Sequence, residues 1–151
     1  MISMTAEYAL RAITWMASRT EVAVGTRDIA EATHVPIGYM SKVLQGLARA
    51  GLVRSRPGRS GGFVLGRAPE AISVLDIVQA IDPIQRIQHC PLGHSQHEGQ
   101  LCPLHRRLDQ AVAMVEQAFA GTTIAELTRE AEQNEVLCTH AGPPGAAPTT
   151  E

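Results

Sequence analysis

The chain has 151 residues, of which 44% are hydrophobic and 3% aromatic, and its formal net charge is −2. This length fits one domain with an appendage, and the scarcity of aromatic side chains favours an aliphatic, mainly helical core. The chain lacks both an apolar run of the roughly 18 residues that span a bilayer and a signal-peptide pattern, so we expect a cytoplasmic protein with no membrane partner and, from its odd number of cysteines, no disulfide framework.

The first predicted helix runs from residue 4 to about residue 18. Tyr8 and Trp15 flank its apolar face, and we expect them to pack against the winged helix described next or against a partner subunit. Glu7 and Arg11 stand four residues apart, a spacing that allows a surface ion pair. The buried face is predicted to hold Ala9, Ala12, Ile13 and Met16.

A helix-turn-helix is predicted next. We expect Thr26 to cap a short helix that runs to Ala32, and Pro36 to disfavour helical backbone before it, which places a turn at residues 33–36. A second helix then runs from about residue 37 to residue 50, and Gly51 ends it in left-handed backbone. Its apolar stripe, spaced by three and four residues, is Met40, Val43, Leu44 and Leu47.

The other face of this helix and the hairpin after it are predicted to bind DNA. Strands at 52–56 and 63–65 flank a Gly-rich tip, and this order of elements is typical of a winged helix-turn-helix. Residues 1–69 hold nine basic and four acidic side chains and residues 70–151 hold four and eleven, which agrees with DNA contact by the first half. The alternatives are a winged helix that contacts protein, or another small α+β unit. The predicted DNA-binding residues are Ser41, Lys42, Gln45, Arg49, Arg54, Arg56 and Arg59.

The periodicity then breaks and resumes. Ser73 is expected to cap a third amphipathic helix, which Asp82 and Pro83 end. Residues 84–101 have no sustained periodicity, and a loop of this length in a small domain is usually functional or disordered. We interpret it as a cofactor-binding loop.

A long helix is predicted from Pro103 to Phe119. Pro103 suits the first helical position, where its missing N–H costs nothing. Apolar side chains step by three and four along this helix, which is typical of a helix that packs on another. We expect a homodimer through this seam; an intramolecular bundle is the alternative. A short helix begins at Thr123 and runs through Glu130. The seam is Leu101, Leu104, Leu108, Ala111, Val115 and Ala118.

The sequence thus predicts a mainly α fold with a small β-hairpin wing and a long dimerisation helix. A winged helix-turn-helix domain occupies residues 1–83, and the cofactor-binding loop occupies 84–101. The dimerisation helix and the short helix after it occupy 102–136, and a mobile tail occupies 137–151.

Several stretches resemble the Rrf2 family of bacterial transcription regulators. They are residues 39–53, 59–65, 72–78 and 122–127. They occur in the family's order, and the match as a whole covers roughly residues 1–130. The resemblance implies a dimeric winged-helix regulator that binds a palindromic operator. It also implies, for many members, an iron–sulfur cluster of the [2Fe–2S] type that senses redox, nitric oxide or iron–sulfur status.

The family's cofactor site falls at the end of the loop. Members resembling the iron–sulfur-assembly regulator space their ligands Cys-x5-Cys-x5-Cys-x2-His. Cys90, Cys102 and His105 match the outer cysteines and the closing histidine, whereas Gln96 stands at the middle cysteine position. The resemblance therefore supplies three ligands and leaves the fourth open.

Three residues are candidates for the fourth ligand. The nitric-oxide-sensing and redox-sensing members resemble this chain at Glu7, which would ligate from the other subunit, although Arg11 stands where the redox-sensing relative has a histidine. The remaining candidates are His94 and His97 in the loop.

The chemistry of these residue types agrees with a metal site. Cys102 directly precedes Pro103 at a helix start, where the helix dipole favours a thiolate, and His105 leaves the same side of the first turn. Two thiolates and an imidazole suit a [2Fe–2S] centre with one more ligand, but also zinc or another single metal. A metal-free thiol sensor or an inert loop is the third alternative. A Cys/His enzyme with Asp109 orienting the imidazole lacks any sign of an oxyanion hole, so we predict no catalysis. Cys138 is interpreted as a free thiol.

Overall fold

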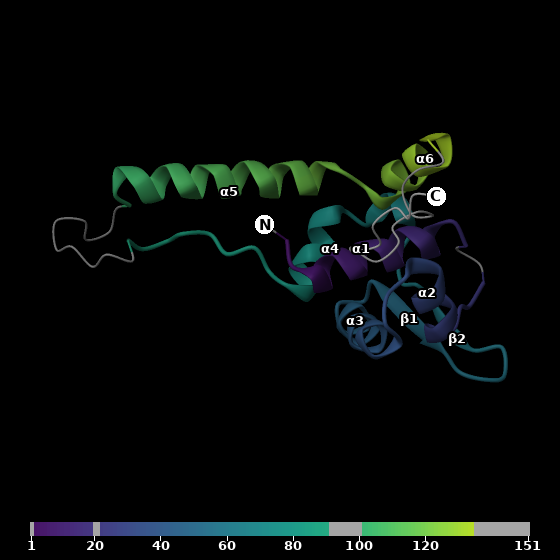
Figure 1. The fold of residues 1–151 in the computed structure, drawn as a ribbon. Coiled ribbons are helices and arrows are strands. Elements are labelled where there is room, and N and C mark those ends of the chain that lie inside the picture. The colour runs from purple at the N-terminus through teal and green to yellow at the C-terminus, as the bar shows by residue number, and fades with distance from the viewer. Residues whose placement is uncertain (1, 20–21, 91–100, 135–151) are drawn as a thin grey trace, which may run out of the picture.

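The computed structural model describes residues 2–19, 22–90 and 101–134. Within them, six α-helices, a short 3-10 helix and one antiparallel hairpin confirm the predicted fold class. Figure 1 shows a body of packed helices and hairpin, from which one long helix projects. The elements are α1 (Met4–Ala17), α2 (Thr26–Thr33), α3 (Ile37–Arg49), β1 (Val53–Arg56), β2 (Gly62–Leu65), η1 (Pro69–Ala71), α4 (Val74–Ile81), α5 (Pro103–Gly121) and α6 (Ile124–Asn134).

Helix α1 lies at the centre of the body. It contacts α2, α3, α4, α6 and β2, and its predicted apolar face is buried. Ala9 and Ala12 are small enough to let the neighbouring helices approach closely, while Ile13 and Met16 fill the space between them. The core is therefore built around the first helix, and the face that it buries is the one its periodicity predicted.

The helix-turn-helix forms as predicted, with one correction at its start. The N-cap of α2 is Gly25, and Thr26, which was expected to be the cap, is the first helical residue. The Asp28 carboxylate accepts the Gly25 N–H at 3.3 Å, so Asp28 supplies the capping hydrogen bond instead of a Thr26 hydroxyl. Gly51 follows the end of α3 with φ 70°, in the left-handed backbone predicted for it.

The wing is anchored to the body by a backbone contact. β1 and β2 pair with Val53 opposite Leu65, and both side chains are buried. Val24, in the loop before α2, exchanges two hydrogen bonds with Phe63, of 3.0 and 2.8 Å. Gly62, at φ 153°, permits this approach, since a Cβ there would lie 2.4 Å from the Val24 carbonyl oxygen. The root of the hairpin is thus fixed, while its tip is exposed.

Helices α4 and α6 complete the body. Ser73 caps α4 as predicted: its hydroxyl accepts the Asp76 N–H at 3.0 Å, and the Asp76 carboxylate accepts the Ser73 N–H at 2.9 Å. α4 packs on α3 at Gly46, where a Cβ would lie 2.8 Å from the Ile81 side chain. α6 brings the chain back to the core, where Ile124 is completely buried.

Helix α5 has a different environment. It ends at Gly121 rather than at Phe119, and none of its 19 residues, all of which the structure describes, is buried. Leu104 and Leu108 of the predicted seam are 60% and 46% exposed. Helix α4 contacts α5, but most of the seam stays exposed, so the described helices do not bury it in an intramolecular bundle. None of the described helices is both long and apolar enough to cross a membrane.

Candidate metal centre and DNA-binding surface

Cys90, Cys102 and His105 come together where α5 begins. Cys102 is the N-cap of the helix and His105 lies in its first turn. Cys90 is the last described residue before residue 101, and we call the irregular backbone of residues 83–90 the strap. The His105 Nδ1 atom lies 3.1 Å from the Cys102 Sγ and 3.6 Å from the Cys90 Sγ. One ligand atom from each residue lies within 4.8 Å of the others. The fold thus joins the three residues that the spacing had singled out.

The surroundings of Cys102 favour the ionised form of its thiol. The His105 backbone N–H donates to its Sγ at 3.5 Å, and this bond, together with the contacts of the His105 ring and the Cys90 side chain, lowers the pKa of Cys102 to about 7. The N-terminal end of α5 acts in the same direction, because its free N–H groups favour negative charge. Cys102 is only 9% exposed and Cys90 is half-buried. Cysteine thiolates and imidazoles are ligands for soft or borderline metals.

The strap is held along α5 by a contact that the sequence analysis missed. Arg86 donates to both carboxylate oxygens of Asp109, at 2.7 and 2.5 Å, and to Glu116 at 3.3 Å. The Ile87 N–H also donates to Asp109, at 3.0 Å. Asp109 stands four residues after His105, a spacing that suggested only an orienting role toward the imidazole in a Cys/His enzyme. Instead, its pKa is lowered chiefly by its bond to the Arg86 side chain.

A signal for this contact was present in the sequence. Arg86 is the only lysine or arginine between residues 68 and 105, and Asp109 and Glu116 are seven residues apart. That spacing puts both carboxylates on one face of a helix. The path of the irregular strap was the missing information.

Of the three candidates for a fourth ligand, Glu7 alone lies in the described residues, and it is not part of the cluster there. The Glu7 carboxylate forms an ion pair with Arg11, as its spacing allowed. Its role as a ligand from another subunit stays a prediction. His94 and His97, like Gln96 and Cys138, lie outside the described residues.

The predicted DNA-reading face of α3 is accessible. Lys42, Gln45 and Arg49 are exposed, and Ser41 is half-buried with its hydroxyl donating to the Ile37 carbonyl at 3.0 Å. The Lys42 Nζ lies 5.9 Å from the ring centroid of Tyr39, an exposed residue that the sequence analysis had not included in this face. Tyr39 in turn meets Tyr8 of α1 edge to face, with the centroids 6.2 Å apart. This settles the packing predicted for Tyr8: it lies against the helix-turn-helix.

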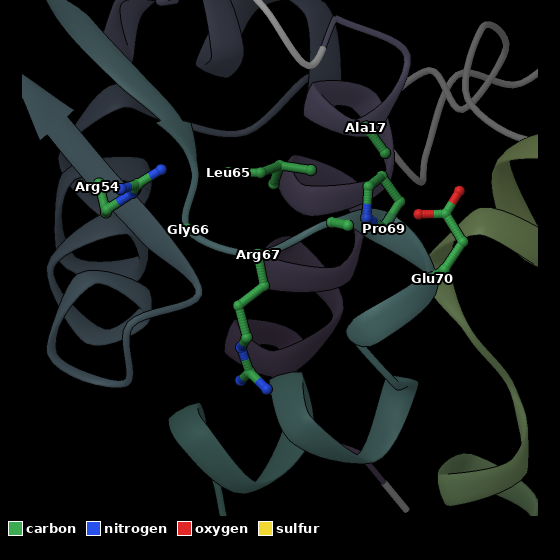
Figure 2. A pocket seen from close by; sticks show the side chains of 8 residues that line it. Ala17, Arg54, Leu65, Gly66, Arg67, Pro69 and Glu70 are labelled. Atoms are coloured by element: carbon green, nitrogen blue, oxygen red, sulfur yellow. The ribbon is translucent and has the colours of Figure 1, made fainter.

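The three wing arginines are all exposed. Arg54 and Arg56 share one side of β1, because side chains alternate along a strand, and Arg59 lies in the hairpin tip. Figure 2 shows Arg54 at the edge of a hollow of about 550 Å³, between the end of α1 and the chain that leaves the wing. Arg67, which also lines this hollow, pairs with Asp76 at 3.8 Å. The hollow shares no residue with the Cys90–Cys102–His105 cluster.

Comparison with known proteins gives a consistent result. The sequence profile of the Rrf2 family, described as iron-dependent transcriptional regulators, matches residues 2–130. A protein of Aquifex aeolicus (strain VF5) named as an HTH-type transcriptional regulator is 28% identical over 137 residues, which span 89% of this chain and 95% of that protein. Two solved structures share the fold. CymR (YrzC), the global cysteine regulator of B. subtilis, has a TM-score of 0.72 at 26% identity and covers 86% of this chain and 97% of its own. IscR of T. potens has a TM-score of 0.72 at 23% identity, with coverages of 92% and 93%.

Proposed function

The chain belongs to the Rrf2 family of transcriptional regulators, and on that premise we propose that it binds a palindromic operator as a homodimer and senses redox, nitric oxide or iron–sulfur status through a [2Fe–2S] cluster. Proteins of this family are regulators rather than enzymes. The observation that carries the proposal is the meeting of two thiols and an imidazole at the start of a helix whose apolar seam is exposed.

For DNA, the proposal assigns two kinds of contact. Ser41, Lys42 and Gln45 read base edges in the major groove, where a helix fits and donor and acceptor patterns differ between base pairs. Arg49 and the wing arginines bind phosphate or the minor groove. Their exposure on one helix face and one hairpin supports this division.

A homodimer supplies the two-fold symmetry that a palindromic operator requires. Its proposed interface is the α5 seam. Leu104, Leu108, Ala111 and Ala118 are exposed, and Val115 is half-exposed. The strap occupies the neighbouring side of α5, through Asp109 and Glu116, and so leaves the seam open to a second copy.

The residues at the cluster fit the proposed cofactor. Cys90 and Cys102 would hold it as thiolates and His105 as a neutral imidazole, with Glu7 of the partner subunit, His94 or His97 as the fourth ligand. A bound [2Fe–2S] centre supplies a one-electron change of charge. The protein's own contribution is to bring the strap and the first turn of α5 to one point, so that a change at the site bears on the helix of the proposed interface.

Two measurements test the proposal. An absorption spectrum of anaerobically purified protein should show the visible bands of an iron–sulfur chromophore, and Cys102→Ala should abolish them, whereas Cys138→Ala should not. A colourless protein with one bound zinc would favour the zinc alternative, and a colourless metal-free protein the thiol sensor. Operator titrations of oxidised, reduced and cluster-free protein should differ by about 1–3 kcal/mol in binding free energy. Three superimposable curves would contradict sensing.

A further inference from the structure

The Asp109 carboxylate joins the strap to α5. It accepts two bonds from the Arg86 guanidinium and one from the Ile87 backbone N–H, and its side chain is only 16% exposed. Glu116, seven residues and about two turns further along α5, accepts a third bond from Arg86. A two-pronged pair of this kind fixes direction as well as distance, because the guanidinium is planar.

The contact between the strap and Asp109 lies next to the candidate metal centre. Cys90 follows Ile87 by three residues, on a strap without regular secondary structure. On the helix, Asp109 follows His105 by four residues, so both side chains lie on the same face one turn apart. The carboxylate therefore holds the strap at the height along α5 where Cys90 reaches His105.

Arg86 is 42% exposed, so water screens its ion pairs and they add little to global stability. The strap has no regular secondary structure, so it lacks the helical hydrogen bonds that fix Cys102 and His105 at the start of α5. Its side-chain anchors on α5 in the described residues are the bonds of Arg86 to Asp109 and Glu116 and the contact of Cys90 with His105. The position of the Cys90 thiol thus depends on a contact made before it in the chain.

We propose that Arg86 and Asp109 form a clamp that positions Cys90 against Cys102 and His105. The two residues are positioning residues and not ligands. The inference rests on the proposed function in that Cys90 is taken as a ligand, but the clamp acts in the metal-free protein, where it can be tested alone.

The test uses reduced, metal-free protein that carries Cys138→Ser, so that Cys90 and Cys102 are the only thiols. Dibromobimane bridges two neighbouring thiols and becomes strongly fluorescent when both have reacted. Asp109→Ala should slow the bridging step about 5-fold, which corresponds to about 1 kcal/mol. Arg86→Met, which leaves the sequence of α5 unchanged, should give the same loss, and Glu116→Gln a smaller one.

Two controls separate positioning from general damage. Arg107→Met removes an exposed arginine of the same helix and should bridge at the rate of the unsubstituted protein. With Cys90 replaced by serine, monobromobimane should alkylate Cys102 at the same rate with and without Asp109→Ala, because the contacts of Cys102 with His105 lie within the first turn of α5.

The outcomes distinguish the two proposals. Unchanged bridging in both Asp109→Ala and Arg86→Met overturns the clamp and leaves the metal centre standing. A lack of bridging in the protein that carries Cys138→Ser alone would show that the two thiols are not neighbours. That result would overturn both the metal centre and the clamp.

Discussion

The winged-helix body and the α5 region are held together by different interactions. In the body, α1, α3 and α4 bury aliphatic side chains such as Ile13, Leu44 and Ile77, each no more than 1% exposed. Along α5 no residue is buried, and the contacts with the strap are hydrogen bonds and ion pairs from Arg86 and Ile87. The body is specified by its own apolar pattern, whereas α5 contacts α4 but has no buried residue and depends more on polar anchors.

This difference places the proposed sensor in the less constrained region. Elements that move in regulation are drawn from the parts of a protein with few buried apolar contacts. A change at Cys90, Cys102 and His105 can shift the strap and α5 without disturbing the core that holds α3. In the proposed dimer, α3 would then move as part of a rigid body, and its distance from α3 of the second copy would change.

The largest effect is expected from a charge at the seam. Leu108→Glu would place two carboxylates across the two-fold axis of the proposed dimer, at a cost of about 3 kcal/mol or more for an unpaired buried charge. Sedimentation should show monomers, and operator affinity should fall with the loss of the second half-site. Gln110→Glu, an exposed position off the seam on the same helix, is the control and should stay dimeric. An intact Leu108→Glu dimer would rule out α5 as the interface.

A second comparison truncates a side chain in each region, within the monomeric Leu108→Glu background. Leu44→Ala in the body should lower the free energy of unfolding by about 2–5 kcal/mol, because it leaves a cavity in a packed core. Met114→Ala on α5, where the side chain is 66% exposed, should change it by less than about 0.5 kcal/mol. Urea denaturation measures both. Equal losses would mean that α5 is packed in the monomer after all.

The same division explains what could be predicted from the sequence. The stripe of α3 and the cap at Ser73 were predicted because periodicity and capping are local properties of side chains. The bridge from Val24 to Phe63 was missed because it consists of backbone hydrogen bonds, which leave no mark in residue type. Thr26 was assigned as a cap because its hydroxyl suits that role, but the cap is Gly25, and the Asp28 carboxylate three residues after it accepts its N–H.

The candidate site was predictable in part for a related reason. Cys102 and His105 share one helical turn, so their meeting follows from spacing. The approach of Cys90 depends on Arg86 reaching Asp109 across 23 residues, along a strap with no period to read. The path of the strap along α5 could therefore not be predicted from the sequence.

A substitution in the wing should leave both regions folded and change only DNA binding. Arg59→Ala should weaken binding to all sequences, and the slope of log affinity against log salt should fall by about one, the effect of one lost phosphate contact. Gln45→Ala on α3 is the matched comparison: it should relax preference at one or two base pairs and keep the salt slope. Fluorescence anisotropy over a salt series measures both. An unchanged slope for Arg59→Ala would remove the wing tip from the interface.

The smallest expected effect is a response to pH confined to the α5 region. The His105 N–H and ring lower the pKa of Cys102 to about 7, against about 8.5 for a free cysteine. In metal-free protein, with Cys90 and Cys138 replaced by serine, the alkylation rate of Cys102 should therefore rise with a midpoint near 7 or slightly above, since one contact is lost. His105→Ala should raise the midpoint only in part, because the backbone N–H that is the largest cause remains.

The lowered pKa of Cys102 also determines the direction in which the free energy of unfolding changes with pH. A thiol whose pKa is lower in the folded protein contributes stability that is fully present above the unfolded pKa and is lost as the pH falls through the folded value. The urea midpoint of metal-free protein should therefore rise slightly from pH 7 to pH 9, and Cys102→Ala should abolish that rise. Hydrogen exchange should locate the gain at the first turn of α5, with no change in α1 or α3. A gain spread over the body would mean that the two regions are coupled more tightly than their contacts indicate, and that α5 cannot move without the core.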